Sequence, residues 1–223
     1  EASAAVIEKI GRYLVGKNPL QIEHHWQSIY RTSHHRGAAI MGGISAVDIA
    51  LWDIAGRYFD VPIYQLLGGK VRDKARVYYH VFGNTRDKLV EGIKDARKQG
   101  FTAVGHLTPF LDESHDIPFF KTHVDKMTDA INAVEMYRDA AGNDVDLCIE
   151  IHRRLTPAEA VVLGRGIEKF HPMFFEDPIR PDNFDAMAYV ASQIGVPIAT
   201  GERLHDIHEF QALLRRDAVQ YIR

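Results

Sequence analysis

Three glutamates stand at equal intervals in the second half of the chain. Glu150, Glu176 and Glu202 are each 26 residues apart, and each ends or follows a short apolar run: DLCIE, MFFE and PIATGE. Three carboxylates that converge would repel one another strongly unless a cation joined them. Because hard oxygen ligands favour magnesium or manganese over zinc, the trio predicts a Mg²⁺ site, with Mn²⁺ as the alternative.

The spacing of the glutamates fits repeated strand and helix units. Apolar runs suited to strands stand at 75–82, 101–107, 145–151, 173–176, 197–200 and 218–223, and helical patterns fill the intervals. Parallel strands joined by helices bring their carboxyl ends to one face, where the glutamates would meet. Six units fit an open doubly wound sheet or an incomplete eight-stranded barrel. The sequence has no G-x-G-x-x-G or Walker loop, which disfavours a nucleotide-binding doubly wound fold.

Local signals divide the chain into a helical part, residues 1–70, and an α/β part, residues 71–223. In the first part, apolar residues recur at helical spacing from Ile22 to Tyr30 and again over 44–58. In the second part, Thr156, Pro157 and Glu159 predict a capped helix start. The segment 108–122 carries two prolines and three acidic residues, and we expect a loop there that covers a site.

The composition restricts the class of protein. The chain has 223 residues, of which 46% are hydrophobic and 26% charged, with a formal net charge of −3. Without a basic stripe we expect no nucleic-acid partner, and without an apolar run near ~20 residues we expect no membrane span. No signal peptide opens the chain, and a single cysteine, Cys148, fits a reducing compartment, so we expect a cytoplasmic protein.

Two blocks of the sequence resemble the mandelate racemase subgroup of the enolase superfamily. One is GGISAVDIALWDIAGRYFDVPIYQLLGG at 42–69, and the other is the set of short motifs EIH, FEDP and GER around the three glutamates. The resemblance implies a modified TIM barrel, incomplete here with about six βα units over 71–223, and a mostly helical part of an α+β capping domain over 1–70. It also implies one essential Mg²⁺, a small-molecule substrate and a homo-oligomer. The N-terminal cap strands and the last barrel strands would be absent.

Within the subgroup, EIHRRLTP at 150–157 looks most like the acid-sugar dehydratases, such as galactonate, gluconate and mannonate dehydratases. The resemblance implies conversion of a sugar acid to a 2-keto-3-deoxy acid through an enediolate. The first ligand in those enzymes is usually Asp, whereas this chain has Glu150. The K-x-K motif of the racemases is absent near His106, and a His–Asp dyad would lie beyond Arg223. A racemase or epimerase and a catalytically silent regulator or scaffold stay open as alternatives.

Candidate site residues follow from position and from this resemblance. His152 lies two residues beyond Glu150, so a strand would direct both side chains to one side, and we expect His152 to be the general acid, with a role as base left open. Arg203 contacts the substrate carboxylate or pairs with Glu176 or Asp177, and Asp177 is expected to be structural, in a turn before a proline. The other candidate substrate-binding residues are Arg154 just beyond the third strand, His106 and His80 at strand ends, and His35 in a predicted cap loop.

Overall fold

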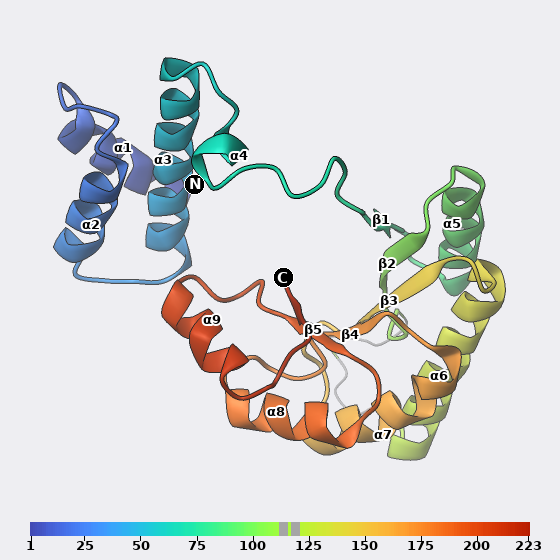
Figure 1. Cartoon of the computed structure of the whole chain (residues 1–223). Helices are drawn as coiled ribbons and strands as arrows, with labels where there is room; N and C mark the ends of the chain where they lie inside the picture. The colour runs from blue at the N-terminus through green and yellow to red at the C-terminus, as the bar shows by residue number, and fades with distance from the viewer. Residues whose placement is uncertain (112–115, 117–120) are drawn as a thin grey trace. The chain divides into compact units, whose positions relative to one another are not determined.

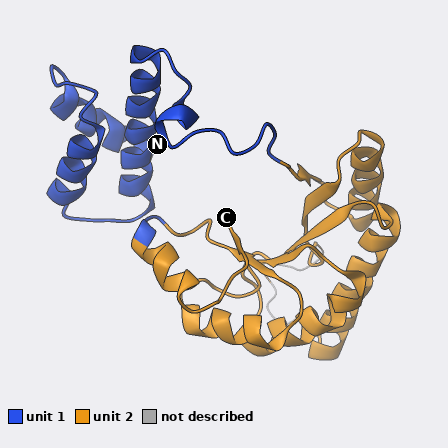
Figure 2. Ribbon diagram, viewed as in Figure 1, with its two compact units in different colours: residues 1–75, 205–207 blue, residues 76–204, 208–223 orange. Residues whose placement is uncertain are grey.

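The computed structural model describes residues 1–111, 116 and 121–223. The chain divides into two compact units (Figure 2), which are Glu1–Ala75 with His205–Ile207, here called the helical unit, and Arg76–Leu204 with His208–Arg223, here called the sheet unit. Most of the predicted loop at 108–122 lies outside the described residues, so its role as a site cover stays a prediction.

The helical unit contains the helices expected from the sequence. They are α1 (Ala2–Leu14), α2 (Ile22–Thr32), α3 (Ala38–Tyr58) and the short α4 (Ile63–Leu66). α3 packs against both α1 and α2 around a core that includes Ile10, Ile29 and Ile44. At the α1–α3 contact, a Cβ on Gly43 would lie only 2.5 Å from Val6 Cγ1, so a glycine is needed for the close approach.

Helix α3 does not fit the expectation that no segment of the chain is apolar enough to span a membrane. Within the described residues it is the one helix, at 21 residues, that is long and apolar enough to cross a membrane by length and composition alone. Its buried side chains, such as Ile44 and Leu51, form part of the core of the helical unit. Because core helices can have the same length and composition, this is weak support for a membrane span.

The sheet unit has strands and helices in strict alternation (Figure 1). Its described strands are all parallel and pair in sequence order: β1 (Tyr79–His80), β2 (Ala103–Leu107), β3 (Asp146–Glu150), β4 (Phe174–Glu176), β5 (Ile198–Thr200) and β6 (Tyr221–Ile222). A doubly wound sheet reverses its strand order at a switch point, whereas a (β/α) barrel does not. The order therefore confirms the expected α/β class and matches six consecutive units of a barrel.

Helices cover one face of this sheet, and Glu150 projects from the opposite face. They are α5 (Arg86–Lys98), α6 (His123–Ala141), α7 (Pro157–Ile167), α8 (Phe184–Gln193) and α9 (Ile207–Leu214), and a 3-10 turn, Glu168–Phe170, follows α7. On β3, Leu147 and Ile149 belong to the large core under the helices, whereas Cys148 belongs to a small cluster on the opposite face. Since side chains alternate along a strand, Glu150 projects on the same side as Cys148.

Local sequence signals agree with most element ends. Thr156 accepts from the backbone N–H of Glu159, and the Glu159 carboxylate accepts from the N–H of Thr156, so the predicted capping box is confirmed. The strands predicted at 75–82 and 218–223 are shorter in the structure, where β1 and β6 have two residues each. Each of these has a single neighbour in the described sheet, which provides fewer ladder hydrogen bonds.

Candidate metal centre and active site

Two buried glutamates lie side by side at the carboxyl ends of β3 and β4. Glu150 and Glu176 are register partners, with residue exposures of 4% and 1%. Burial, together with the charge of Asp177, raises the pKa of Glu150 to about 7. Burial also raises the pKa of Glu176 to about 8, with a further contribution from the charge of Glu150. The pair therefore holds protons near neutral pH unless a cation offsets its charge.

Arg223, a residue that the sequence did not single out, binds one of these glutamates. Its Nε lies 2.8 Å from Glu176 Oε1, and its Nη1 donates to Glu176 Oε2 over 3.0 Å. The same guanidinium contacts the hydroxyl of Tyr78, just before β1. These contacts lower the pKa of Glu176, but burial acts in the opposite direction and prevails.

A second arginine, Arg153, joins the remaining acidic groups. It donates to Asp177 Oδ2 over 2.7 Å and also pairs with Glu202. Asp177 accepts a further bond of 2.5 Å from the hydroxyl of Thr200. Arg153 thus joins Glu202 to Asp177, the residue after Glu176, and the Glu202 side chain remains 40% exposed.

These ion pairs correct one expectation about Arg203. In the described part of the chain, the partner of Asp177 is Arg153 and the partner of Glu176 is Arg223, so neither carboxylate pairs with Arg203. Arg203 is exposed beyond β5. The spacing of the glutamates predicts a metal ion among them, but it does not indicate which arginines pair with these carboxylates.

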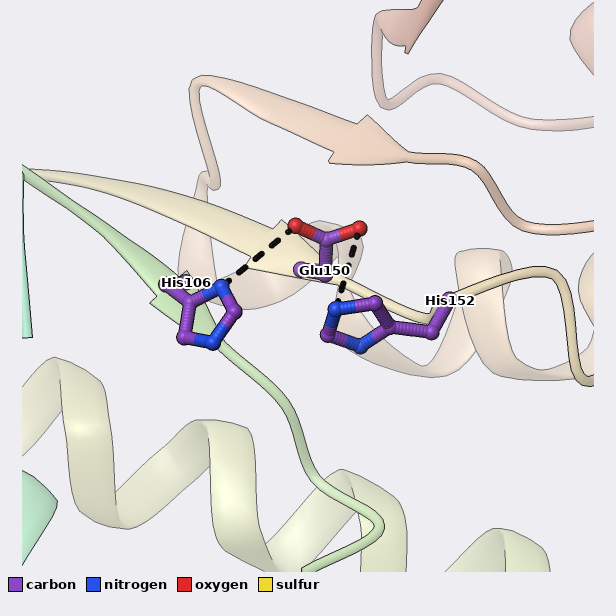
Figure 3. A group of neighbouring side chains, drawn as sticks. All are labelled: His106, Glu150 and His152. Atoms are coloured by element: carbon purple, nitrogen blue, oxygen red, sulfur yellow. Dashed lines mark ion pairs between the residues drawn. The ribbon is translucent and has the colours of Figure 1, made fainter. Parts of the chain in front are cut away.

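Two histidines point toward the carboxylate of Glu150 (Figure 3). His152 Nε2 lies 3.7 Å from Glu150 Oε1, and His106 Nδ1 lies 3.8 Å from Glu150 Oε2. The two rings meet edge to face with centroids 5.3 Å apart. Burial lowers the pKa of His152, and the charge of His106 lowers it further, so a neutral imidazole at His152 is favoured near pH 7.

The backbone that aims these rings differs from the strand geometry assumed for the sequence. β3 ends at Glu150, and His152 has a positive φ of 56°, so the alternation argument does not apply to it. His106 has a φ of 62° and sits in an irregular stretch of the β2–β3 pairing, between Val104 and Leu107. Bulges of this kind redirect side chains and occur next to active sites. The left-handed backbone, rather than strand parity, brings both rings to Glu150.

The other candidate residues lie at different distances from this centre. His80 stacks on His106 with centroids 5.5 Å apart, and burial lowers its pKa. Arg154 donates to the carbonyl of Phe110 over 3.0 Å, which links β3 to the segment after β2. His35 is exposed between α2 and α3 in the helical unit. Roles in substrate binding for all three stay predictions.

The oxygen atoms of the glutamate pair fit a bound cation. Glu150 Oε1 and Glu176 Oε1 are buried, and neither has a hydrogen-bond partner of good geometry among the described residues, although Glu176 Oε1 lies 2.8 Å from Arg223 Nε in an ion pair. A buried polar atom without a partner is costly, and a metal ion would satisfy both. Carboxylate donors suit Mg²⁺ or Mn²⁺. One group of side chains with ligand atoms in mutual reach is His106, Glu150 and His152.

Comparisons with known proteins agree with this architecture. The enolase C-terminal domain-like model matches residues 88–223, and the mandelate racemase / muconate lactonizing enzyme N-terminal domain model matches residues 1–68. A D-galactonate dehydratase of Cronobacter sakazakii is 33% identical over 94% of this chain and 54% of its own. The chain therefore spans about half the length of the curated relatives it matches.

Solved structures give the same result for the fold. A mandelate racemase/muconate lactonizing enzyme-like protein from Roseovarius sp. is 30% identical, with a TM-score of 0.86, over 100% of this chain and 59% of its own. The 3,6-anhydro-D-galactonate cycloisomerase from Zobellia galactanivorans is 27% identical, with a TM-score of 0.86 over the same shares.

Proposed function

The chain belongs to the mandelate racemase and muconate lactonizing enzyme family of the enolase superfamily, and we propose that it is part of a hydro-lyase that dehydrates a sugar acid with bound Mg²⁺. In this reaction the proton next to the carboxylate and the β-hydroxyl are lost as water, and the product is a 2-keto-3-deoxy acid. The likeness to a D-galactonate dehydratase supports a sugar acid as the substrate class.

Glu150, Glu176 and Glu202 would hold the Mg²⁺. The buried Glu150 Oε1, which has no hydrogen-bond partner among the described residues, supports this assignment, and the buried carboxylate of Glu176 lies beside it in register. Glu202 is partly exposed and paired with Arg153, so it would share its carboxylate between the arginine and the ion. A bound divalent cation supplies positive charge where negative charge develops on the substrate carboxylate as the α-proton leaves.

The proposal depends above all on one observation, the proximity of His152 Nε2 to Glu150 Oε1 at 3.7 Å. His152 would protonate the β-hydroxyl as the C–O bond breaks, and the hydroxyl would depart as water. Its lowered pKa makes the imidazolium, which is the minor form near pH 7, a stronger acid for this step. With 32% of its side chain exposed, the ring can reach a bound substrate.

The second candidate function is that of a racemase, epimerase or cycloisomerase, whose reaction would begin with the same removal of the α-proton. The likeness to a cycloisomerase of an anhydro sugar acid favours keeping this second candidate, because the same fold carries that activity. A catalytically silent regulator or scaffold is the third.

Incubation of the whole protein of which this chain is part with Mg²⁺ and a library of sugar acids in deuterated water separates the three. We expect formation of a keto acid from at least one aldonate. Deuterium at the α-carbon without loss of water would support the epimerase instead. No product and no exchange with any acid would refute an enzymatic role.

A further inference from the structure

We propose that His106, Glu150 and His152 form a second metal site, selective for borderline transition-metal ions such as Zn²⁺, that shares Glu150 with the Mg²⁺ site but uses different partners (Figure 3). The proposal does not depend on the dehydratase activity.

The donor set is the first argument. Two imidazoles and one carboxylate suit Zn²⁺, Co²⁺ or Ni²⁺, whereas Mg²⁺ prefers oxygen donors. The ion that fills this group would therefore differ from the one that suits three glutamates. Three protein ligands also leave a coordination position open for water or another ligand.

The distances are the second argument. His152 Nε2 and His106 Nδ1 lie 3.7 Å and 3.8 Å from the two oxygens of Glu150, and all ligand atoms of the group lie within 4.8 Å of one another. In a tetrahedral site with metal–ligand bonds of about 2.1 Å, two ligands of one ion are about 3.4 Å apart. The farthest pair of ligand atoms would therefore have to approach by at most about 1.4 Å, or about 0.7 Å for each side chain.

The third argument is that the side chains of His106, Glu150 and His152 are free to bind an ion. The histidine side chains are 34% and 32% exposed, so an ion can reach them, whereas the Glu150 side chain is 6% exposed. Glu150 Oε1 has no hydrogen-bond partner among the described residues. Both histidines adopt the left-handed backbone, which is uncommon for residues with a side chain and gathers at functional sites.

The shared ligand makes the two sites compete. An ion held by His106 and His152 occupies Glu150 and the ring that would transfer a proton. If the proposed function holds, Zn²⁺ inhibits dehydration and excess Mg²⁺ relieves the inhibition. Binding itself can be tested without activity.

Calorimetric titration of the metal-free protein with Zn²⁺ tests the site, with three kinds of variant. His106→Gln and His152→Gln each remove one ligand and should weaken binding by about tenfold or more, since even the loss of an outer-shell partner costs 10–100-fold. His80→Gln is the matched control, because His80 stacks on His106 but is outside the group, and it should leave the affinity unchanged.

Glu176→Gln separates this site from the Mg²⁺ site. It should retain Zn²⁺ binding while it loses Mg²⁺ binding. Unchanged Zn²⁺ affinity in both ligand variants, an equal loss in His80→Gln, or loss of Zn²⁺ binding in Glu176→Gln would each overturn the proposal. Failure of the dehydratase assay would leave these binding results unaffected, so the two proposals fail separately.

Discussion

Glu150 and Glu176 are adjacent in register, yet they have different neighbours: two histidines flank Glu150, and Arg223 pairs with Glu176. The guanidinium offsets part of the charge of Glu176, whereas one oxygen of Glu150 has no hydrogen-bond partner among the described residues. The asymmetry makes Glu150 the oxygen donor that most needs a cation. On the two proposals above, two kinds of ion would compete for it.

Glu176→Gln should abolish Mg²⁺ binding and metal-dependent activity while the fold is retained. The amide keeps the size of the side chain and removes one negative charge, and Arg223 then lacks its ionic partner. Mg²⁺ affinity is measured by calorimetry and the fold by circular dichroism. Unchanged Mg²⁺ affinity would exclude Glu176 from the site.

Mg²⁺ affinity should rise with pH through neutrality, and binding should release protons. The ion needs deprotonated carboxylates, and the pKa values of Glu150 and Glu176 are raised to about 7 and about 8. The same shifts mean that the folded metal-free protein binds more protons than the unfolded chain. Its free energy of unfolding should therefore fall as pH rises from about 4.5, the ordinary glutamate value, to about 8.

Calorimetry in two buffers of different ionisation enthalpy measures the proton release at pH 7, and urea unfolding at several pH values measures the stability. Glu176→Gln should release fewer protons with any ion that it still binds. An Mg²⁺ affinity that stays constant through neutral pH would contradict this prediction.

Gly105→Ala should destabilise the sheet unit and disturb the contact between Tyr78 and Arg223. A Cβ at Gly105 would lie 2.4 Å from Tyr78 Cε2 and 3.2 Å from Cys148 Cβ, so the ring has to move. Overpacking of this kind costs about 1–3 kcal/mol, which urea unfolding measures. Because the loss arises from the ring, Gly105→Ala should cost much less in a Tyr78→Ala background.

Gly11→Ala is the matched control for the glycine substitution. Gly11 lies within α1, and nothing lies within 4 Å of the position of its added Cβ. Alanine should stabilise the helix by about 0.5–1 kcal/mol. Equal effects of the two substitutions would show that the contact with Tyr78 has no influence.

The sequence predicts the elements well where the signal is local. Thr156 and Glu159 form the capping box that their spacing indicates, and Leu89 and Ile93 are buried in α5 as their helical spacing predicts. The family resemblance, and with it the α/β barrel class, is confirmed by the domain matches. Signals of this kind depend on residues close together in the chain.

The partners within the site could not be predicted in the same way. Arg223 and Glu176 are 47 residues apart, and their contact depends on how β4, β5 and β6 align. The directions of His106 and His152 depend on positive φ angles that a non-glycine sequence does not signal. The spacing of the glutamates indicated a shared location, but only the register of β3 and β4 shows which two are adjacent.

His152→Asn should separate proton removal from loss of water. If His152 is the acid that protonates the β-hydroxyl, the variant should still exchange the α-proton with deuterated solvent, because another group removes that proton. Water loss should fall by about 10²–10⁴-fold, the effect of a lost general acid. Exchange is followed by mass spectrometry and dehydration by the amount of keto acid.

A substrate with fluoride in place of the β-hydroxyl provides the control for His152→Asn. Fluoride needs little protonation to leave, so this substrate should recover much of the lost rate. Loss of exchange and dehydration together, without recovery by fluoride, would instead make His152 the base. If neither rate changes, the 3.7 Å approach of His152 to Glu150 has no catalytic consequence, and the dehydratase proposal loses the observation on which it depends.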